Sequence, residues 1–324
     1  MFGTLRTLFG GRRAAARSSA KAPPATATQR RISPELLKQV KLIELKTRGL
    51  VNTLFTGEYR SVFKGQGMEF AEVREYLPGD EVRSIDWNVT ARMSRPYVKR
   101  YIEERELNVM LVLDVSGSER FGTVHKFKSD LVIEFAAVIA MSAVRNNDRV
   151  GVLFVTDRVE YAVAPRKGKR HVLRIVRDLL AFEPVGTRTN LVPALQYLQR
   201  TLHQHTIIFL VSDFLTTNFE GELKVLQQRH DVVAVTVDDP GERALPDVGV
   251  ARLVDPETGT QIEIDTSDRR VRSAYADRMA ADAGARRRLL RRLGIDEISL
   301  VTEGGVVEPL LKFFRNRELR LRRQ

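Results

Sequence analysis

The sequence contains no cysteine and no apolar stretch long enough to cross a membrane. The absence of cysteine excludes disulfides and thiolate metal sites, and it fits a reducing compartment. The longest apolar run, residues 135–144, is well short of the roughly 18 residues that a membrane span needs. The N-terminus also lacks the apolar segment of a secretory signal. We therefore expect a cytoplasmic protein with no transmembrane segment.

Signatures of common enzymes are missing as well. No G-x-x-x-x-G-K-S/T sequence for nucleotide phosphates occurs, and none of the five histidines has the spacing of a metal site or a catalytic triad. Ser116 lacks the Gly-x-Ser-x-Gly frame of a serine hydrolase. It also stands where an aspartyl-phosphate phosphatase would have its second aspartate. We therefore expect a protein that is not an enzyme, with a metal-dependent hydrolase as an alternative.

The net charge of +12 is confined to the two ends of the chain. Residues 1–34 contain seven Lys or Arg and no acid, and residues 312–324 contain six Lys or Arg and one acid. The residues between them are balanced in charge. Because phosphate binding needs clustered cations, only these ends and the Arg-rich residues 286–292 would contact nucleic acid or an acidic membrane surface. We favour solvated tails and a solvated helix face over such contacts.

Composition and turn signals divide the chain into five parts. A disordered basic arm is expected over residues 1–32, followed by a helix from Ser33 and a β-rich segment up to residue 106. An α/β core then spans residues 107–240. Residues 241–311 complete this domain, and residues 312–324 form a basic tail.

Within the core, short apolar runs alternate with amphipathic segments. Strands are expected at residues 109–113, 149–155, 159–163, 207–211 and 232–237, and helices at residues 126–145, 169–182, 191–202 and 220–229. Later, two short strands at residues 251–254 and 261–264, a helix at 275–293 and a strand at 297–302 follow. This alternation predicts an α/β fold with a doubly wound, mostly parallel sheet.

The sequence Asp114-Val-Ser116-Gly-Ser118 directly follows the first core strand. Ligands of open α/β sheets bind at the carboxyl ends of the strands. Carboxylate and hydroxyl oxygens are hard ligands that suit one Mg²⁺ or Mn²⁺ ion. The alternative is a turn in which these side chains only bond to the local backbone.

Two further loops bring oxygen donors to the same edge of the sheet. They are the loop of residues 186–191, with Thr189, and the loop that contains Asp213. The three loops together resemble the metal-ion-dependent adhesion site of a von Willebrand factor A-like domain. That resemblance implies that Ser116, Ser118 and Thr189 bind the metal directly, that Asp114 and Asp213 bind it directly or through water, and that a partner's Asp or Glu completes the site. Thr187 is the alternative to Thr189.

The segment before the first core strand narrows the resemblance. It contains, in order, Gly65-Gln-Gly-Met-Glu-Phe70, Arg74-Glu-Tyr76, Pro78-Gly-Asp80, Val82-Arg83-Ser-Ile-Asp-Trp87, Ala91-Arg92 and Val98-Lys99. This run closely resembles the prokaryotic family known as domain of unknown function fifty-eight, whose members are von Willebrand factor A-like and are associated with MoxR-type AAA+ ATPases. Many of its members carry N-terminal membrane helices, which this sequence does not.

Five side chains in this segment have a predicted role. We expect Trp87, the only tryptophan, to anchor the segment to the core. Four charged residues are candidates either for a structural ion-pair network or for a partner-binding surface. They are Asp80, Arg83, Asp86 and Arg92.

These features favour a binding module over an enzyme. The resemblance implies an adaptor or cochaperone-like protein that engages an unknown protein client through Mg²⁺ and works with a MoxR-type AAA+ ATPase in protein assembly or activation. The alternative is a protein that uses its basic tails to bind nucleic acid or a membrane surface. That alternative predicts steep salt dependence and loss of binding when the tails are removed.

Overall fold

The computed structural model describes residues 69–93, 95–102, 106–120 and 127–322, together with Lys38, Lys41, Leu42 and Glu44. The chain divides into a small unit of residues 63–107 and a large unit that contains the rest. The basic arm predicted over residues 1–32 lies outside the described residues. So does most of the helix predicted from Ser33, of which the four described residues are helical.

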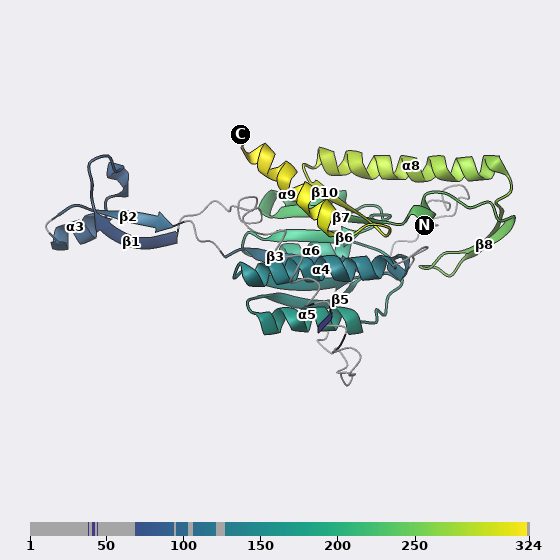
Figure 1. Cartoon of the computed structure of the whole chain (residues 1–324), viewed down its shortest axis with the longest axis horizontal. Helices are drawn as coiled ribbons and strands as arrows, with labels where there is room; N and C mark the ends of the chain where they lie inside the picture. The colour runs from purple at the N-terminus through teal and green to yellow at the C-terminus, as the bar shows by residue number, and fades with distance from the viewer. Residues whose placement is uncertain are drawn as a thin grey trace. The chain divides into compact units, whose positions relative to one another are not determined.

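The large unit is built on a six-stranded sheet (Figure 1). Its strands, in order across the sheet, are β10 (Asp296–Val301), β7 (Asp231–Asp238), β6 (Ile207–Ser212), β3 (Asn108–Asp114), β4 (Arg149–Val155) and β5 (Val159–Arg166). All neighbours pair in parallel except β4 and β5, which pair antiparallel across a tight turn. Every residue of β6 is buried, as expected for a parallel strand covered on both faces. The mixed α/β fold with a central, mostly parallel sheet is confirmed.

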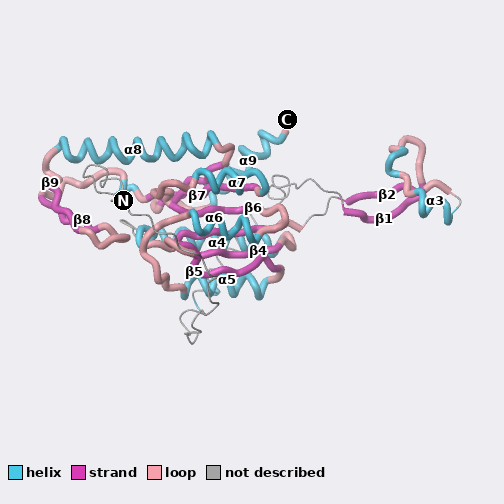
Figure 2. The backbone as a smooth tube through the Cα atoms, turned by 180° about the vertical axis from the view of Figure 1, so that it is seen from behind, coloured by secondary structure: helices cyan, strands magenta, loops and turns pink. Residues whose placement is uncertain are grey.

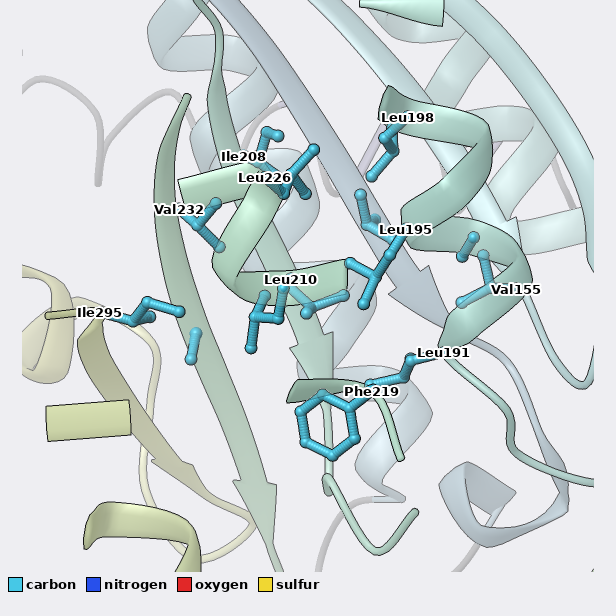
Figure 3. Packing of buried hydrophobic residues seen from close by; sticks show 14 of the residues in the cluster. Val155, Leu191, Leu195, Leu198, Ile208, Leu210, Phe219, Leu226, Val232 and Ile295 are labelled. Carbon is cyan, nitrogen blue, oxygen red and sulfur yellow. The ribbon is translucent and has the colours of Figure 1, made fainter. Parts of the chain in front are cut away.

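Helices cover both faces of this sheet. They are α4 (Lys128–Arg145), α5 (Lys169–Ala181), α6 (Val192–Thr201), α7 (Glu220–Arg229), α8 (Arg269–Arg292) and α9 (Val307–Leu321). Helices α4 and α5 lie in front of the sheet in Figure 1, and α6 and α7 lie in front of it in the reverse view of Figure 2. Leu195, Leu198 and Leu226 of α6 and α7 pack against Ile208 and Leu210 of β6 (Figure 3).

The opposite face of the same strand packs against α4. The rings of Phe135 in α4 and Phe209 in β6 meet edge to face at 5.8 Å. Side chains of a strand alternate between its two faces, so β6 contributes to both cores. The central strands are thus held on both sides, which fixes where their carboxyl ends lie.

Helix α9 replaces much of the basic tail that we predicted over residues 312–324. Leu310, Phe313 and Phe314 of this helix are buried. Arg317 forms ion pairs with Asp231 and Asp296, at the starts of β7 and β10. The prediction was wrong for this segment because we read its positive charge as a sign of solvation. Arg317 and Arg320 instead pair with acids of the sheet.

Removal of the Phe314 ring tests whether α9 is part of the core. We expect Phe314→Ala to lower the free energy of unfolding by about 3–5 kcal/mol, the usual cost of deleting a buried phenylalanine. Leu319→Ala is the matched control, because Leu319 lies in the same helix and is 53% exposed. Urea denaturation followed by circular dichroism measures both. Equal stability of the two variants would contradict the buried position of α9.

The small unit is a two-stranded antiparallel ribbon with two short helices. It contains β1 (Glu69–Glu75), the 3₁₀ helix η2 (Val82–Ser84), α3 (Trp87–Met93) and β2 (Tyr97–Ile102). The strands fit the predicted β-rich segment, but α3 was not predicted. Trp87 is 67% exposed, and its role as an anchor of the segment to the core stays a prediction.

The four charged candidates in this unit do not form one network among themselves. Asp80 pairs with Arg74 at 2.6 Å, and hydrogen bonds from Arg74 and from the Leu77 amide lower the pKa of Asp80. Asp86 accepts bonds from backbone amides in the first turn of α3. Arg83 and Arg92 are exposed. A partner-binding role for the four residues stays a prediction.

The remaining elements follow β7. They are the 3₁₀ helix η4 (Pro240–Glu242) and the strands β8 (Val250–Val254) and β9 (Gln261–Asp265). One further 3₁₀ helix, η3 (Gly117–Arg120), comes earlier in the chain, after β3. Strands β8 and β9 form a separate hairpin beyond the end of the sheet (Figure 2). None of the helices in the described part of the chain is long and apolar enough to cross a membrane.

Candidate functional site

Asp114 lies at the carboxyl end of β3 and fixes the loop that follows. Its Oδ1 accepts a hydrogen bond of 3.0 Å from the Ser116 amide, and its Oδ2 accepts one of 2.8 Å from the Ser212 hydroxyl. Ser212 is the last residue of the neighbouring strand β6. Asp114 and Ser116 are fully buried, so this loop is part of the folded core.

Three hydroxyl groups lie next to one another beside this aspartate. Ser116 Oγ is 3.1 Å from Ser118 Oγ and 2.8 Å from Thr189 Oγ1. Thr187, the alternative to Thr189, is exposed, and its hydroxyl donates to the backbone carbonyl of Glu257 instead. The structure therefore places Thr189, and not Thr187, against the serine pair.

Asp213 follows β6 and is 2% exposed. Its Oδ1 accepts a bond from the Leu215 amide, whereas its buried Oδ2 has no hydrogen-bond partner among the described residues. The next residue, Phe214, has a left-handed backbone with φ of 57°, which is uncommon for a bulky side chain. A buried carboxylate oxygen without a donor is costly, so this position calls for a positively charged neighbour.

The two aspartates affect each other electrostatically. Burial, and then the charge of Asp213, raise the pKa of Asp114 to about 7. Two buried carboxylates in close proximity resist full ionisation unless a cation neutralises them. The unpartnered oxygen, the raised pKa and the three hydroxyls together fit a hard divalent cation. No cluster of three His, Asp or Glu side chains suited to a metal occurs among the described residues, so this donor set depends on hydroxyls.

Other charged groups border the site, and none of them was predicted from the sequence pattern. Lys128 is fully buried at the start of α4, with its Nζ 2.6 Å from Glu242. Burial raises the pKa of Glu242, while the charge of Lys128 opposes that shift and the charge of Asp213 adds to it. Glu242 and Asp213 also line a cavity of about 380 Å³ beneath α8. Lysine is usually a surface residue, so its type does not predict this position.

Arg286 of α8 also lies at this edge of the sheet. Its side chain is only 9% exposed. It donates to the Asp213 carbonyl at 2.9 Å and forms an ion pair with Asp238 at 3.0 Å. We had assigned residues 286–292 to a solvated helix face, and this was wrong for Arg286. Its guanidinium instead supports the loop that contains Asp213.

The turn between β8 and β9 packs onto the same loops. Thr189 Oγ1 lies 2.6 Å from Glu257 Oε1, and a Cβ atom on Gly117 would lie 2.4 Å from the Pro256 carbonyl oxygen. Glycine is thus required at position 117 by close contact with the backbone of this turn. The sequence predicted two short strands here but no contact with the site. The turn residues Asp255-Pro-Glu-Thr-Gly259 were the available sign of a hairpin.

Comparison with known proteins places the chain in a family. A family model described as "Protein of unknown function DUF58" matches residues 72–285. The chain belongs to the DUF58 family. The matched region includes all five predicted metal ligands and Glu257.

The relatives of this DUF58 protein include uncharacterised proteins of Mycobacterium tuberculosis and Bacillus subtilis. An uncharacterised protein of Mycobacterium tuberculosis is 32% identical over 287 residues, which cover 88% of this chain and 90% of that protein. The uncharacterised protein YeaD of Bacillus subtilis is 28% identical over 110 residues, which cover 34% of this chain and 25% of YeaD.

Among solved structures, the similarities are more distant. An aerotolerance-related membrane protein from Bacteroides fragilis is 14% identical, with a TM-score of 0.45, and the match covers 66% of this chain and 99% of that one. The conserved hypothetical protein BatB from Bacteroides thetaiotaomicron is 13% identical, with a TM-score of 0.43, over 67% of this chain and all of that one.

Proposed function

We propose that this DUF58 protein is a non-catalytic binding module with a von Willebrand factor A-like core. In this proposal Asp114, Ser116, Ser118, Thr189 and Asp213 hold one Mg²⁺ or Mn²⁺ ion. The ion supplies positive charge and an open coordination position for the carboxylate of a partner protein. The observation that carries the proposal is the buried Oδ2 of Asp213, which has no hydrogen-bond partner among the described residues and lies beside Asp114 and three adjacent hydroxyls.

The bonding of the hydroxyls favours binding over catalysis. A serine nucleophile needs an adjacent base that accepts its proton. The described hydrogen bonds of Ser116 Oγ join it to Ser118 and Thr189, which are hydroxyls and cannot act as the base. We therefore infer recognition rather than hydrolysis at this site.

The proposed partner is a MoxR-type AAA+ ATPase or its protein client, on the basis of the family resemblance stated above. In this arrangement the ATPase provides the energy of nucleotide hydrolysis and this chain provides recognition. The nucleic-acid alternative loses part of its basis, because Arg317, Arg320 and Arg322 near the C-terminus pair with acids of the same fold.

Affinity capture from native lysate tests the proposal. We expect the wild type to retain a partner in Mg²⁺ and to release it in EDTA, and we expect Asp114→Ala to retain little in either buffer. Asp277→Ala is the matched control, because Asp277 is exposed on α8 and the substitution is the same. Mass spectrometry identifies the retained proteins. A partner held equally by Asp114→Ala would place recognition outside this site.

A further inference from the structure

A carboxylate of the chain itself already contacts the proposed metal site. Glu257 Oε1 lies 2.6 Å from Thr189 Oγ1, and that oxygen lies 2.8 Å from Ser116 Oγ. Glu257 is separated from Thr189 by 68 positions in the sequence, so the contact depends on the tertiary fold. An acidic side chain is the kind of group that the site would receive from a partner.

The hydrogen-bond directions at Thr189 are compatible with a cation. A hydroxyl has one proton to donate and two lone pairs that accept. A carboxylate is a stronger acceptor than a neutral hydroxyl, so Thr189 donates to Glu257. Its lone pairs then remain on the side of Ser116, where they would bind a cation together with the serine oxygens.

The turn that carries Glu257 is rigid in its own right. Asp255 is 3% exposed and accepts bonds from the Glu257 amide and the Thr258 hydroxyl. Gly259 has φ of 69°, which glycine adopts without strain. These bonds fix the backbone at Glu257, so that little conformational entropy remains to be lost when its side chain binds.

Contacts of this turn tie the hairpin to the site. Strands β8 and β9 pair only with each other among the described strands, and Val250 and Val254 are 71% and 52% exposed. A lone two-stranded hairpin is marginally stable in water. The Thr187 hydroxyl donates to the Glu257 carbonyl at 2.9 Å, which adds a second bond between the turn and the site. Such a hairpin is able to leave without disturbing the six-stranded sheet.

We propose that Glu257 is an internal ligand of the site, which a partner's carboxylate must displace. The β8–β9 hairpin then competes with the partner for the same cation. The inference rests on the proposed function, because it requires the cation at Asp114 and its neighbours. It adds that the free protein closes its own site and that partner binding opens the hairpin.

Titration of the full-length protein with Mn²⁺ tests this, with water-proton relaxation as the readout. Four proteins are compared: wild type, Glu257→Gln, Glu263→Gln and Asp114→Asn. Glu263 is the matched control, since it lies in the same hairpin, is exposed and forms an ion pair with exposed Arg252. We expect Glu257→Gln to bind Mn²⁺ about tenfold more weakly, as when a supporting carboxylate is lost. We also expect higher relaxivity per bound ion, because water takes the vacated position. Glu263→Gln should match the wild type.

The outcomes separate the two proposals. If Glu257→Gln equals the wild type in affinity and relaxivity while Asp114→Asn loses binding, the metal site stands and the internal ligand is disproved. If wild type and Asp114→Asn behave alike, the proposed function fails, and the inference fails with it.

Two further readouts show whether the hairpin moves. Mn²⁺ should slow hydrogen exchange of residues 250–265 in the wild type and leave it unchanged in Glu257→Gln. In the Mg²⁺ capture experiment, Glu257→Gln should retain more partner than the wild type. Reduced capture by Glu257→Gln would overturn the inference, because Glu257 would then help to hold the partner.

Discussion

In the absence of metal, Asp114→Asn should be more stable than the wild type at pH 8, and this difference should vanish near pH 4. Burial and the charge of Asp213 raise the pKa of Asp114 to about 7, from an ordinary value of 3.8. Between these two pH values the folded protein binds more protons at Asp114 than the unfolded chain does. The contribution of Asp114 to stability therefore falls as the pH rises from about 4 to about 7, and it is constant above that range.

The asparagine variant removes this contribution without changing the shape of the side chain. Its amide oxygen can accept the bond from the Ser116 amide, and its NH₂ group faces the Ser212 hydroxyl. One pKa unit corresponds to about 1.4 kcal/mol, so the expected gain at pH 8 is a few kcal/mol. Urea denaturation in EDTA at pH 4 and pH 8 gives the difference. Asp277→Asn controls for the loss of one surface charge.

Addition of Mg²⁺ should reverse the order of stability. A ligand that binds only the folded state stabilises it by mass action, and Asp114→Asn should not respond. If the asparagine variant is the less stable protein at pH 8 in EDTA, Asp114 is neutralised by a group other than the proposed cation. The two carboxylates would then have a purely structural role.

Lys128→Met should cause the second large effect, a loss of about 3–5 kcal/mol of unfolding free energy at pH 8. The lysine is fully buried and its Nζ lies 2.6 Å from Glu242. Its removal would leave Glu242 close to Asp213 without the compensating charge. Because burial already raises the pKa of Glu242, the variant should take up a proton there, and the loss should shrink as the pH falls.

The double variant Lys128→Met/Glu242→Gln identifies the cause. Replacement of both partners of a buried pair is often nearly neutral, whereas removal of one is costly. We expect the double variant to regain most of the stability, and we expect exposed Lys224→Met to stay within about 0.5 kcal/mol of the wild type. A double variant no more stable than Lys128→Met would show that the lysine stabilises the fold by something other than its pairing with Glu242.

The sequence predicted the parts of the site that lie at strand ends. Asp114 follows a continuous apolar run, and Asp213 follows another, so a parallel sheet brings both to one edge. Glu257 could not be found in this way, because it belongs to a hairpin outside the sheet and its contact with Thr189 joins distant positions. Hydrophobic patterns locate the ends of the sheet strands, but they do not show that the turn between β8 and β9 packs against those ends.

The wrong predictions for residues 286–292 and 312–324 have a common cause, which is the length of the charged arginine side chain. Arg286 and Arg317 are half-buried with their charges paired, whereas their Arg-rich neighbours in the sequence indicated solvated positions. Residue type predicts average burial, and pairing partners far away in the sequence decide the individual case.

The exposed position of Trp87 has a practical consequence for spectroscopy. It is the only tryptophan in the sequence and belongs to the small unit of residues 63–107. All tryptophan emission therefore comes from a residue of the small unit, whereas far-ultraviolet circular dichroism is dominated by the helices and strands of the large unit. One denaturation experiment that records both fluorescence and circular dichroism will follow the two units separately. A partner that binds next to Trp87 on the small unit will shift the wavelength of maximum emission without changing the circular dichroism.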